Sequence, residues 1–517
     1  MERMGTDMKI AEIVSEKPLI MKMKENYRYF GGLSLLYGLI FAFCLYRNTA
    51  GITFPLCVAA TIGFALLFMK KINYKMQKHS VPYIVGMVLL GVSTALTDSW
   101  FLHFFNMAGI ILLFFVFMIH QFYNDYRWNF PAYLKRIFIL LWTVVECLPY
   151  PYRHGTKTFG MSKDDKERNT LLAIVIGVLV ALGILSVTLP LLLKSDAMFA
   201  KIFGDLLRYI NFSTIFGIAF MIVLGFTLSY AFFSALCKYN FPEGRDRKLK
   251  YYNPVIGITF TGIVTSIYLM YCLIQIMYLF IGISAGLPDS MTYSEYARGG
   301  FWELLFVSFI NFIMVLLCMY IFSENIVLKI VLTIVSGCTF IMIASAAYRI
   351  LLYVKVYHLT FLRILVIWFL IVLTLIMSGV IISIYKKKFP LFQYIMAVVG
   401  ALYIVLSFSR PDAIVAKYNI AHTEDMTREG LHYYMYQLSQ DAAPEIAKVD
   451  VDKLQRKGEY GYTKEHTKWN VYNYFLNISK ENEGLYFRKA NYSRIRAKFV
   501  ADKWLEEHKD YAQYEYY

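Results

Sequence analysis

This chain of 517 residues has little charge and no clustered cysteines, and both absences narrow its class. Charged residues make up 17% of the sequence, whereas soluble domains contain about 25%. The seven cysteines lie in or beside apolar segments and form no CxxC pair, so we expect neither a disulfide framework nor a zinc site. An H-x-x-x-H pair, a P-loop and a dinucleotide-binding glycine pattern are also missing. We therefore expect no metal and no cofactor.

Long apolar runs are what the chain has instead, with 58% hydrophobic residues and a mean hydropathy of +0.49. Crossing a bilayer takes roughly 20 apolar helical residues. The eleven candidate runs are Leu33–Tyr46, Ile52–Met69, Val81–Thr97, Trp100–Phe122, Leu171–Leu193, Phe212–Cys237, Val255–Ser284, Phe301–Phe322, Ile326–Ala347, Ile364–Tyr385 and Phe389–Phe408. They predict an all-α, polytopic transmembrane helix bundle of about 11 spans.

The composition changes sharply after Phe408, where long apolar runs stop. Residues 409–517 contain 17 Lys or Arg and 17 Asp or Glu, so the net charge of +16 lies entirely in residues 1–408. Such an excess is typical of cytoplasmic loops in a membrane protein, and we expect no binding to nucleic acid. The sequence predicts a cytoplasmic segment at 1–28, a transmembrane bundle at 29–408 and an extramembrane helical domain at 409–517.

The basic residues also indicate an orientation. The first 28 residues are polar, and no cleavage site follows Leu33–Tyr46, which we interpret as an uncleaved anchor. The short apolar segment Ile137–Leu148 has basic residues on both sides and is followed by Pro149. We interpret it as re-entrant or interfacial, because counting it as a span would move several basic loops outside. The expected topology has the N-terminus in the cytoplasm and the C-terminal domain outside.

The tail contains apolar stripes at helical spacing, and the last of them is mixed with basic residues. Its apolar members are Tyr492, Ile495, Phe499, Val500 and Trp504. Packing of such stripes on one another is the default for a small helical domain. Aromatic residues interleaved with Lys and Arg are also typical of contact with lipid headgroups. The expected partners are the lipid bilayer, and through the tail either anionic headgroups or an envelope protein.

Several short blocks, in this order along the chain, resemble a known family. They are Tyr293–Leu304, Tyr348–Tyr353, Leu359–Arg363, Arg410–Asp412 with Asn419, Leu438–Pro444 and Asn491–Ser493. Together they are similar to an uncharacterised family of bacterial multi-pass membrane proteins, domain of unknown function 4173, related to 4153. The resemblance covers roughly 170–517, with 170–408 as its membrane core. In that family a glycine usually stands where this chain has His358. The resemblance implies a bacterial cell membrane and supplies no activity.

Ionisable residues at the ends of spans are the candidates for a site, because charge at membrane depth is costly. In the expected topology one polar group gathers at the outer face: Tyr293, Glu295, Tyr296, Arg298, Glu303, Arg349, Tyr353, His358, Arg363, Arg410 and Asp412. Arginine forks in such a group match phosphate or carboxylate. There are two simpler alternatives. The basic side chains could snorkel to the membrane interface, and Glu303 could stabilise a helix N-terminus. Asp98, in a very short turn, is expected to be solvated.

Two classes of function remain open from the sequence. The first is a non-enzymatic cell-envelope scaffold, sensor or transporter-like protein, and the lack of a clear internal repeat lowers transport relative to scaffold. The alternative is a membrane-embedded enzyme acting on a lipid-linked or anionic envelope substrate at the outer leaflet. Its acid/base candidates are Glu295, Glu303 and His358. An apolar interior favours the scaffold, and a lateral cleft lined by those residues favours the enzyme.

Overall fold

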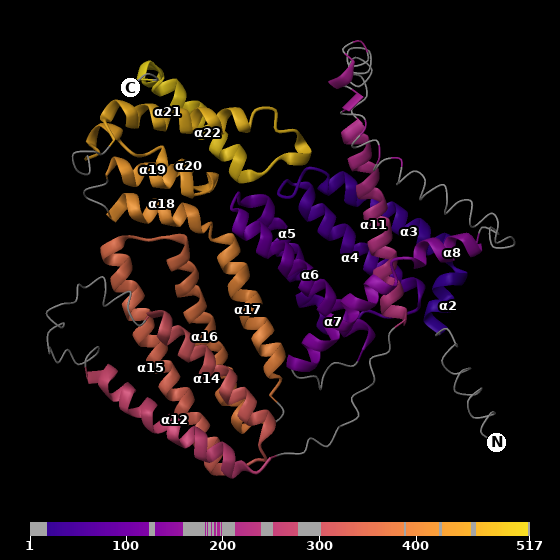
Figure 1. The fold of residues 1–517 in the computed structure, drawn as a ribbon, viewed down its shortest axis with the longest axis vertical. Helices are drawn as coiled ribbons and strands as arrows, with labels where there is room; N and C mark the ends of the chain where they lie inside the picture. Colours follow the sequence, from indigo (N-terminus) through magenta and orange to yellow (C-terminus); the bar gives the residue numbers. More distant parts are fainter. Residues whose placement is uncertain are drawn as a thin grey trace. The chain divides into compact units, whose positions relative to one another are not determined.

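The computed structural model describes residues 18–123, 130–158, 212–238, 252–277, 301–386, 389–422, 427–455 and 462–514, with single positions between 181 and 198. Regular structure within these ranges is helical (Figure 1), apart from two isolated bridges. The chain is therefore an all-helical protein, as the sequence predicts.

Nine described helices are long and apolar enough to cross a membrane. They are α3 (Tyr27–Leu45), α4 (Thr53–Lys71), α6 (Trp100–Phe122), α11 (Phe212–Lys238), α12 (Pro254–Gln275), α14 (Phe301–Ile321), α15 (Ile326–Tyr357), α16 (Phe361–Tyr385) and α17 (Leu391–Phe408). A tenth predicted run forms the shorter apolar helix α5 (Val81–Leu96). The eleventh, Leu171–Leu193, lies outside the described ranges except for single positions. The chain is thus a multi-pass membrane protein.

The segment with the uncertain path, Ile137–Leu148, forms most of α7 (Phe130–Glu146). At 17 residues this helix is not one of the nine candidate spans. Two prolines, Pro149 and Pro151, follow it at the start of α8 (Tyr150–Thr158). Glu146, at the end of α7, pairs with Lys238 at 2.8 Å. The interpretation of this segment as non-spanning stays a prediction.

The chain divides into two compact units, and the first comprises residues 1–88, 111–125 and 131–243. Its described elements are α2 (Pro18–Glu25), α3, α4, η1 (Lys78–Ser80), α7, α8, α11 and parts of α5 and α6. The helices α3 and α11 approach closely at Gly38 and Gly225. A Cβ atom on Gly38 would lie 2.5 Å from the Ile222 carbonyl oxygen. Small residues at such contacts let membrane helices pack backbone to backbone.

The second unit comprises residues 89–110, 126–130 and 244–517, and contains α12, α14 to α17 and the tail. Figure 1 shows α14 to α17 running alongside one another, with the tail beyond one end of them. Buried hydrogen bonds join these helices. Ser345 donates to the Gln275 side chain at 2.7 Å, and Asn311 donates to Thr339 at 3.0 Å. These two bonds link α12 to α15 and α14 to α15.

The described part of the tail contains nine short helical elements and a hydrophobic core of its own. They are α18 (Pro411–His422), α19 (Arg428–Gln437), η3 (Gln440–Ala442), α20 (Ala443–Ile446), η4 (Val451–Lys453), α21 (Lys464–Glu481), η5 (Phe487–Lys489), α22 (Tyr492–Glu507) and η6 (Lys509–Tyr514), with an isolated bridge between Thr427 and Gln455. Leu431, Phe475 and Trp504 are buried together in this core. Their burial gives the tail an apolar centre that does not depend on lipid.

The last predicted stripe does not form a single face, and the prediction is corrected here. Trp504 is 4% exposed, whereas Phe499 is 71% exposed. The helical period of 3.6 residues separates them, because Ala497, Ala501 and Trp504 face the tail core. The apolar residues Tyr492, Ile495 and Phe499 are left on the opposite, exposed face of α22.

Candidate functional site

The tail is joined to the turn between α5 and α6 by side-chain hydrogen bonds and one ion pair. Thr97 donates its hydroxyl to the Asp441 carboxylate, and the Asp98 amide lies 3.4 Å from both Asp441 oxygens. The Arg494 guanidinium pairs with the Asp98 carboxylate at 2.7 Å. The prediction that Asp98 is solvated is wrong, because its side chain is only 12% exposed. We call this set, with Asn491 described next, the tail junction.

Asn491 completes the tail junction by serving two helices with one side chain. Its amide nitrogen donates to the carbonyl oxygens of Thr97 at 2.9 Å and Thr94 at 3.2 Å. Its side-chain oxygen accepts from the amide nitrogens of Ser493 and Arg494, which begin α22. Both ends of a helix leave backbone groups without helical partners. A single buried asparagine thus satisfies carbonyls near the end of α5 and caps the start of α22.

The tail has two buried carboxyl groups in this region, those of Asp412 and Asp441. Asp412, in the first turn of α18, accepts from the Ser439 hydroxyl at 2.7 Å and from the Ser439 amide at 3.3 Å. Burial raises the pKa of Asp412, and the nearby charge of Asp441 adds to the increase. Burial likewise raises the pKa of Asp441, against the lowering effect of hydrogen bonds from Ser493 and Thr97. The hydroxyl groups that donate to these carboxyl groups oppose the increase in pKa, because they stabilise the ionised form.

Two further contacts hold the tail to the spans of the second unit. The Arg410 guanidinium lies 4.7 Å from the centre of the Tyr492 ring, a cation–π arrangement that links the end of α17 to α22. Asn419 of α18 pairs with the backbone of Leu359, donating and accepting at 2.8 Å each. The blocks around 359, 410, 419, 438 and 491 that carry the family resemblance therefore meet at one end of the bundle.

The turn between α15 and α16 is shorter than the sequence suggests. The apolar run Ile326–Ala347 predicts a span that ends at Ala347, but α15 continues to Tyr357. No glycine or proline interrupts 348–357, and Ile350 and Val354 there are buried. His358 ends the helix with φ of 62° and ψ of 176°, a backbone conformation that strongly favours glycine. A glycine at this position would adopt the same backbone conformation without strain.

The structure separates the described site candidates into groups. Arg363 donates to the backbone carbonyls of Tyr357, at 2.5 Å, and His358, and its guanidinium lies 4.3 Å from the Tyr353 ring centre. Arg410 and Asp412 belong instead with the contacts of the tail. Glu303 lies in the first turn of α14, where the helix-dipole explanation expects it. Arg349 is 8% exposed within α15. The remaining candidates, Tyr293, Glu295, Tyr296 and Arg298, lie outside the described residues.

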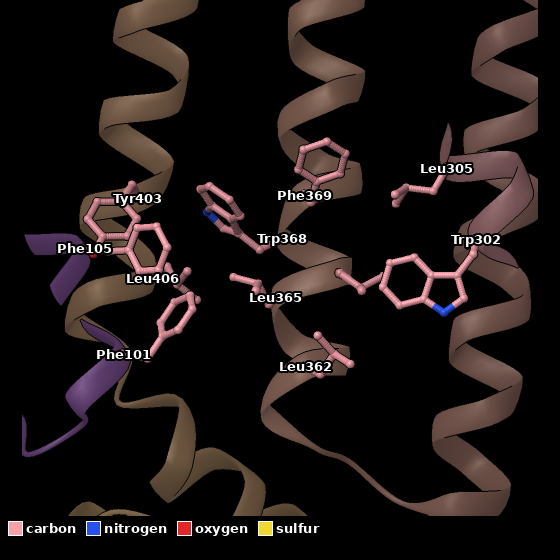
Figure 2. A pocket seen from close by; sticks show the side chains of 11 residues that line it. Phe101, Phe105, Trp302, Leu305, Leu362, Leu365, Trp368, Phe369, Tyr403 and Leu406 are labelled. Atoms are coloured by element: carbon pink, nitrogen blue, oxygen red, sulfur yellow. The ribbon is translucent and has the colours of Figure 1, made fainter. Parts of the chain in front are cut away.

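A cavity of about 340 Å³ lies between α6, α14, α16 and α17. Figure 2 shows Trp302 of α14 on one side, Phe101 of α6 on the other and Trp368 of α16 between them. The polar atoms of its lining side chains are engaged elsewhere. Trp368 donates to the Leu402 carbonyl at 2.9 Å, and Tyr403 donates to Asn106 at 2.9 Å. None of the acid/base candidates in the described residues lines this cavity.

The sequence-based candidates omitted most of the tail junction. Asp441 and Asn491 belong to two of the resembling blocks, and that position was the available signal. The sequence shows Arg494 only as one of the basic residues of the last stripe, Thr97 only as the end of the run Val81–Thr97, and Asp98 only as part of a short turn. Among the described residues, no group of His, Cys, Asp or Glu is placed to hold a metal ion.

Comparison with known proteins gives one match. Residues 84–449 match a family described as domain of unknown function (DUF4153). No curated protein and no solved structure matches the chain. The family that matches is the relative named in the resemblance, and the likeness to 4173 itself stays a prediction. The match begins before residue 170, where the resemblance starts, and ends inside the tail.

Replacing His358 with glycine is expected to stabilise the protein. The observed backbone conformation costs a non-glycine residue about 1–3 kcal/mol, so His358→Gly should raise the midpoint of thermal unfolding in detergent. His358→Ala is the matched control, because it removes the imidazole without relieving the backbone. An equal increase for both variants, or none for glycine, would contradict the strain at this turn.

Asn491→Ala is expected to loosen α22 from the spans. The variant loses the cap of α22, worth about 0.5–2 kcal/mol, and also leaves buried carbonyls unpaired, at about 1–3 kcal/mol. Hydrogen exchange of the full-length protein should become faster in α22 and in the turn at 97–99. Thr463→Ala is the control, since Thr463 caps α21 by accepting from the His466 amide. If both variants change exchange at 97–99 equally, Asn491 does not join the two parts.

Proposed function

Because the chain belongs to the DUF4153 family, whose function is unknown, we propose a role from its own geometry. The protein acts as a non-enzymatic cell-envelope scaffold or sensor, and presents its helical tail from the end of its own spans. The observation that carries this proposal is the tail junction, where Asp98, Asp441 and Asn491 are engaged in holding the tail. A tail fixed by buried polar contacts at the bundle end offers a partner a surface of defined position.

The setting of the charged candidates favours this role over catalysis. A general acid or base must reach a substrate proton from a cleft. The described cavity is lined by apolar and aromatic side chains. Arg363 is bound to backbone carbonyls, and Asp412 is bound to Ser439. These contacts support a structural use of the groups, and they support scaffold over transport for the same reason.

We place the protein in a bacterial plasma membrane with its N-terminus in the cytoplasm and its tail outside. The Arg494–Asp98 pair supports the expected number of crossings, because it requires the turn at 97–99 and the tail to lie on the same side. An even number of crossings must then separate them. Of the described helices, α6, α11, α12, α14, α15, α16 and α17 are candidates for crossing. Leu171–Leu193 makes the number even only if α7 does not cross.

Reporter fusions test this topology. Alkaline phosphatase fused after Tyr517 should be active, because it reaches the oxidising side, while the same enzyme inserted after Thr158 should be inactive. The Thr158 position is informative because a spanning α7 would move it outside. Activity at both positions would contradict the non-spanning α7, and inactivity after Tyr517 would place the tail in the cytoplasm.

Complementation of a strain lacking this protein separates scaffold from enzyme. The variant Asp441→Ala/Asn491→Ala, which removes contacts of the tail junction, is expected to fail at normal membrane abundance. The variant Glu295→Gln/Glu303→Gln/His358→Ala, which removes the acid/base candidates, is expected to complement fully. The reverse pattern would favour the enzyme acting on an envelope substrate.

A further inference from the structure

The stretch from η5 into α22 exposes large apolar side chains. Phe487 is 75% exposed, Phe499 is 71% exposed, and Ile495 and Tyr492 are 51% and 50% exposed. The basic residues Lys489 and Arg496 are exposed among them. We call these six residues the α22 face. Contiguous exposed apolar side chains mark a contact surface more often than a solvated one.

Charge gives this surface a preferred partner. The stretch 486–503 contains six Lys or Arg and one Asp or Glu. The tail as a whole has equal numbers of the two kinds, so the excess is local. Aromatic and aliphatic side chains mixed with basic ones match the boundary between acyl chains and anionic headgroups. Binding to a protein surface of ordinary composition does not require exposed apolar and basic side chains together.

Three contacts place the start of α22 where spans of the second unit end. Asn491 binds the carbonyls of Thr94, in the last turn of α5, and of Thr97, just beyond that helix. Arg494 pairs with Asp98, two residues before α6 begins. Tyr492 contacts Arg410, two residues after the end of α17. The first turn of α22 therefore lies at the depth where these helices leave the hydrocarbon region.

We propose that the α22 face lies in the headgroup layer of the membrane that the spans cross, and binds anionic phospholipid headgroups there. The apolar side chains enter the boundary of the acyl chains, and Lys489 and Arg496 contact the phosphates. Each basic residue near an anionic surface contributes about 1 kcal/mol, and the apolar residues add their burial. The tail junction holds α22 at a fixed depth beside the membrane. A helix tethered in this way needs less affinity for lipid than a free helix does. This inference does not depend on the function proposed above or on which side the tail occupies.

A fluorescent probe on the α22 face tests the proposal in the full-length protein. The seven native cysteines are buried, so a surface cysteine at Phe487→Cys can be labelled with an environment-sensitive dye, with the unsubstituted chain as blank. The protein is placed in phosphatidylcholine nanodiscs with or without phosphatidylglycerol and with lipids carrying a quencher near the headgroup. Tyr436→Cys is the matched control, because Tyr436 is an exposed aromatic residue (53%) on α19.

The expected result is strong quenching at Phe487 that increases with phosphatidylglycerol, and weak quenching at Tyr436. Adding Lys489→Gln/Arg496→Gln should lower the anionic-lipid-dependent part by up to about fivefold per charge removed. Lys448→Gln/Lys453→Gln, which removes two exposed lysines elsewhere in the tail, should leave it unchanged. Quenching that is equal at the two probe positions would overturn the proposal. Quenching indifferent to phosphatidylglycerol would overturn the headgroup part of it.

Discussion

Carbonyl groups at the C-terminal end of α5 need hydrogen-bond partners, and in this protein a tail residue supplies them. Thr94 and Thr97 present their carbonyl oxygens at the edge of the membrane region, and Asn491 binds both. The same requirement applies to Asp98 and Asp441, whose carboxylates are largely buried beside Arg494 and Thr97. Unpaired polar groups at such depth are costly. The position of the tail in the second unit follows from that requirement, because separation would leave several groups unsatisfied together.

This constraint also explains why charged candidates near the bundle end do not form an open site. Arg363 closes the turn after α15, and Asn419 pairs with Leu359 on the same turn. Below them, the cavity walls are carbon, since Trp368 and Tyr403 use their polar atoms for other helices. Polar groups thus concentrate at the helix ends and apolar ones at membrane depth. This arrangement fits the proposed scaffold better than an enzyme with a polar substrate cleft.

The sequence predicted the class of fold well because apolar run length is a local property. Nine of the eleven runs coincide with candidate spans, and one more with α5. It predicted the tail junction poorly because the partners there are hundreds of residues apart. Asp98 looked solvated until Arg494 was seen beside it, and Trp504 looked like part of a surface stripe until the tail core formed around it. His358 is intermediate: its departure from a usual glycine was visible, but its positive φ required the structure.

The pairing between Asn491 and Thr94 spans 397 positions of sequence, and this has a consequence for biosynthesis. A ribosome makes α5 early and α22 long afterwards, so the last turn of α5 waits for its partner through most of translation. During that interval these carbonyl groups must accept hydrogen bonds from water, lipid headgroups or an insertion factor. Folding at this end of α5 is therefore complete only after the C-terminal residues have been made. A chain that ends before Asn491 would lack the partner of these carbonyl groups and would be exposed to quality-control proteases.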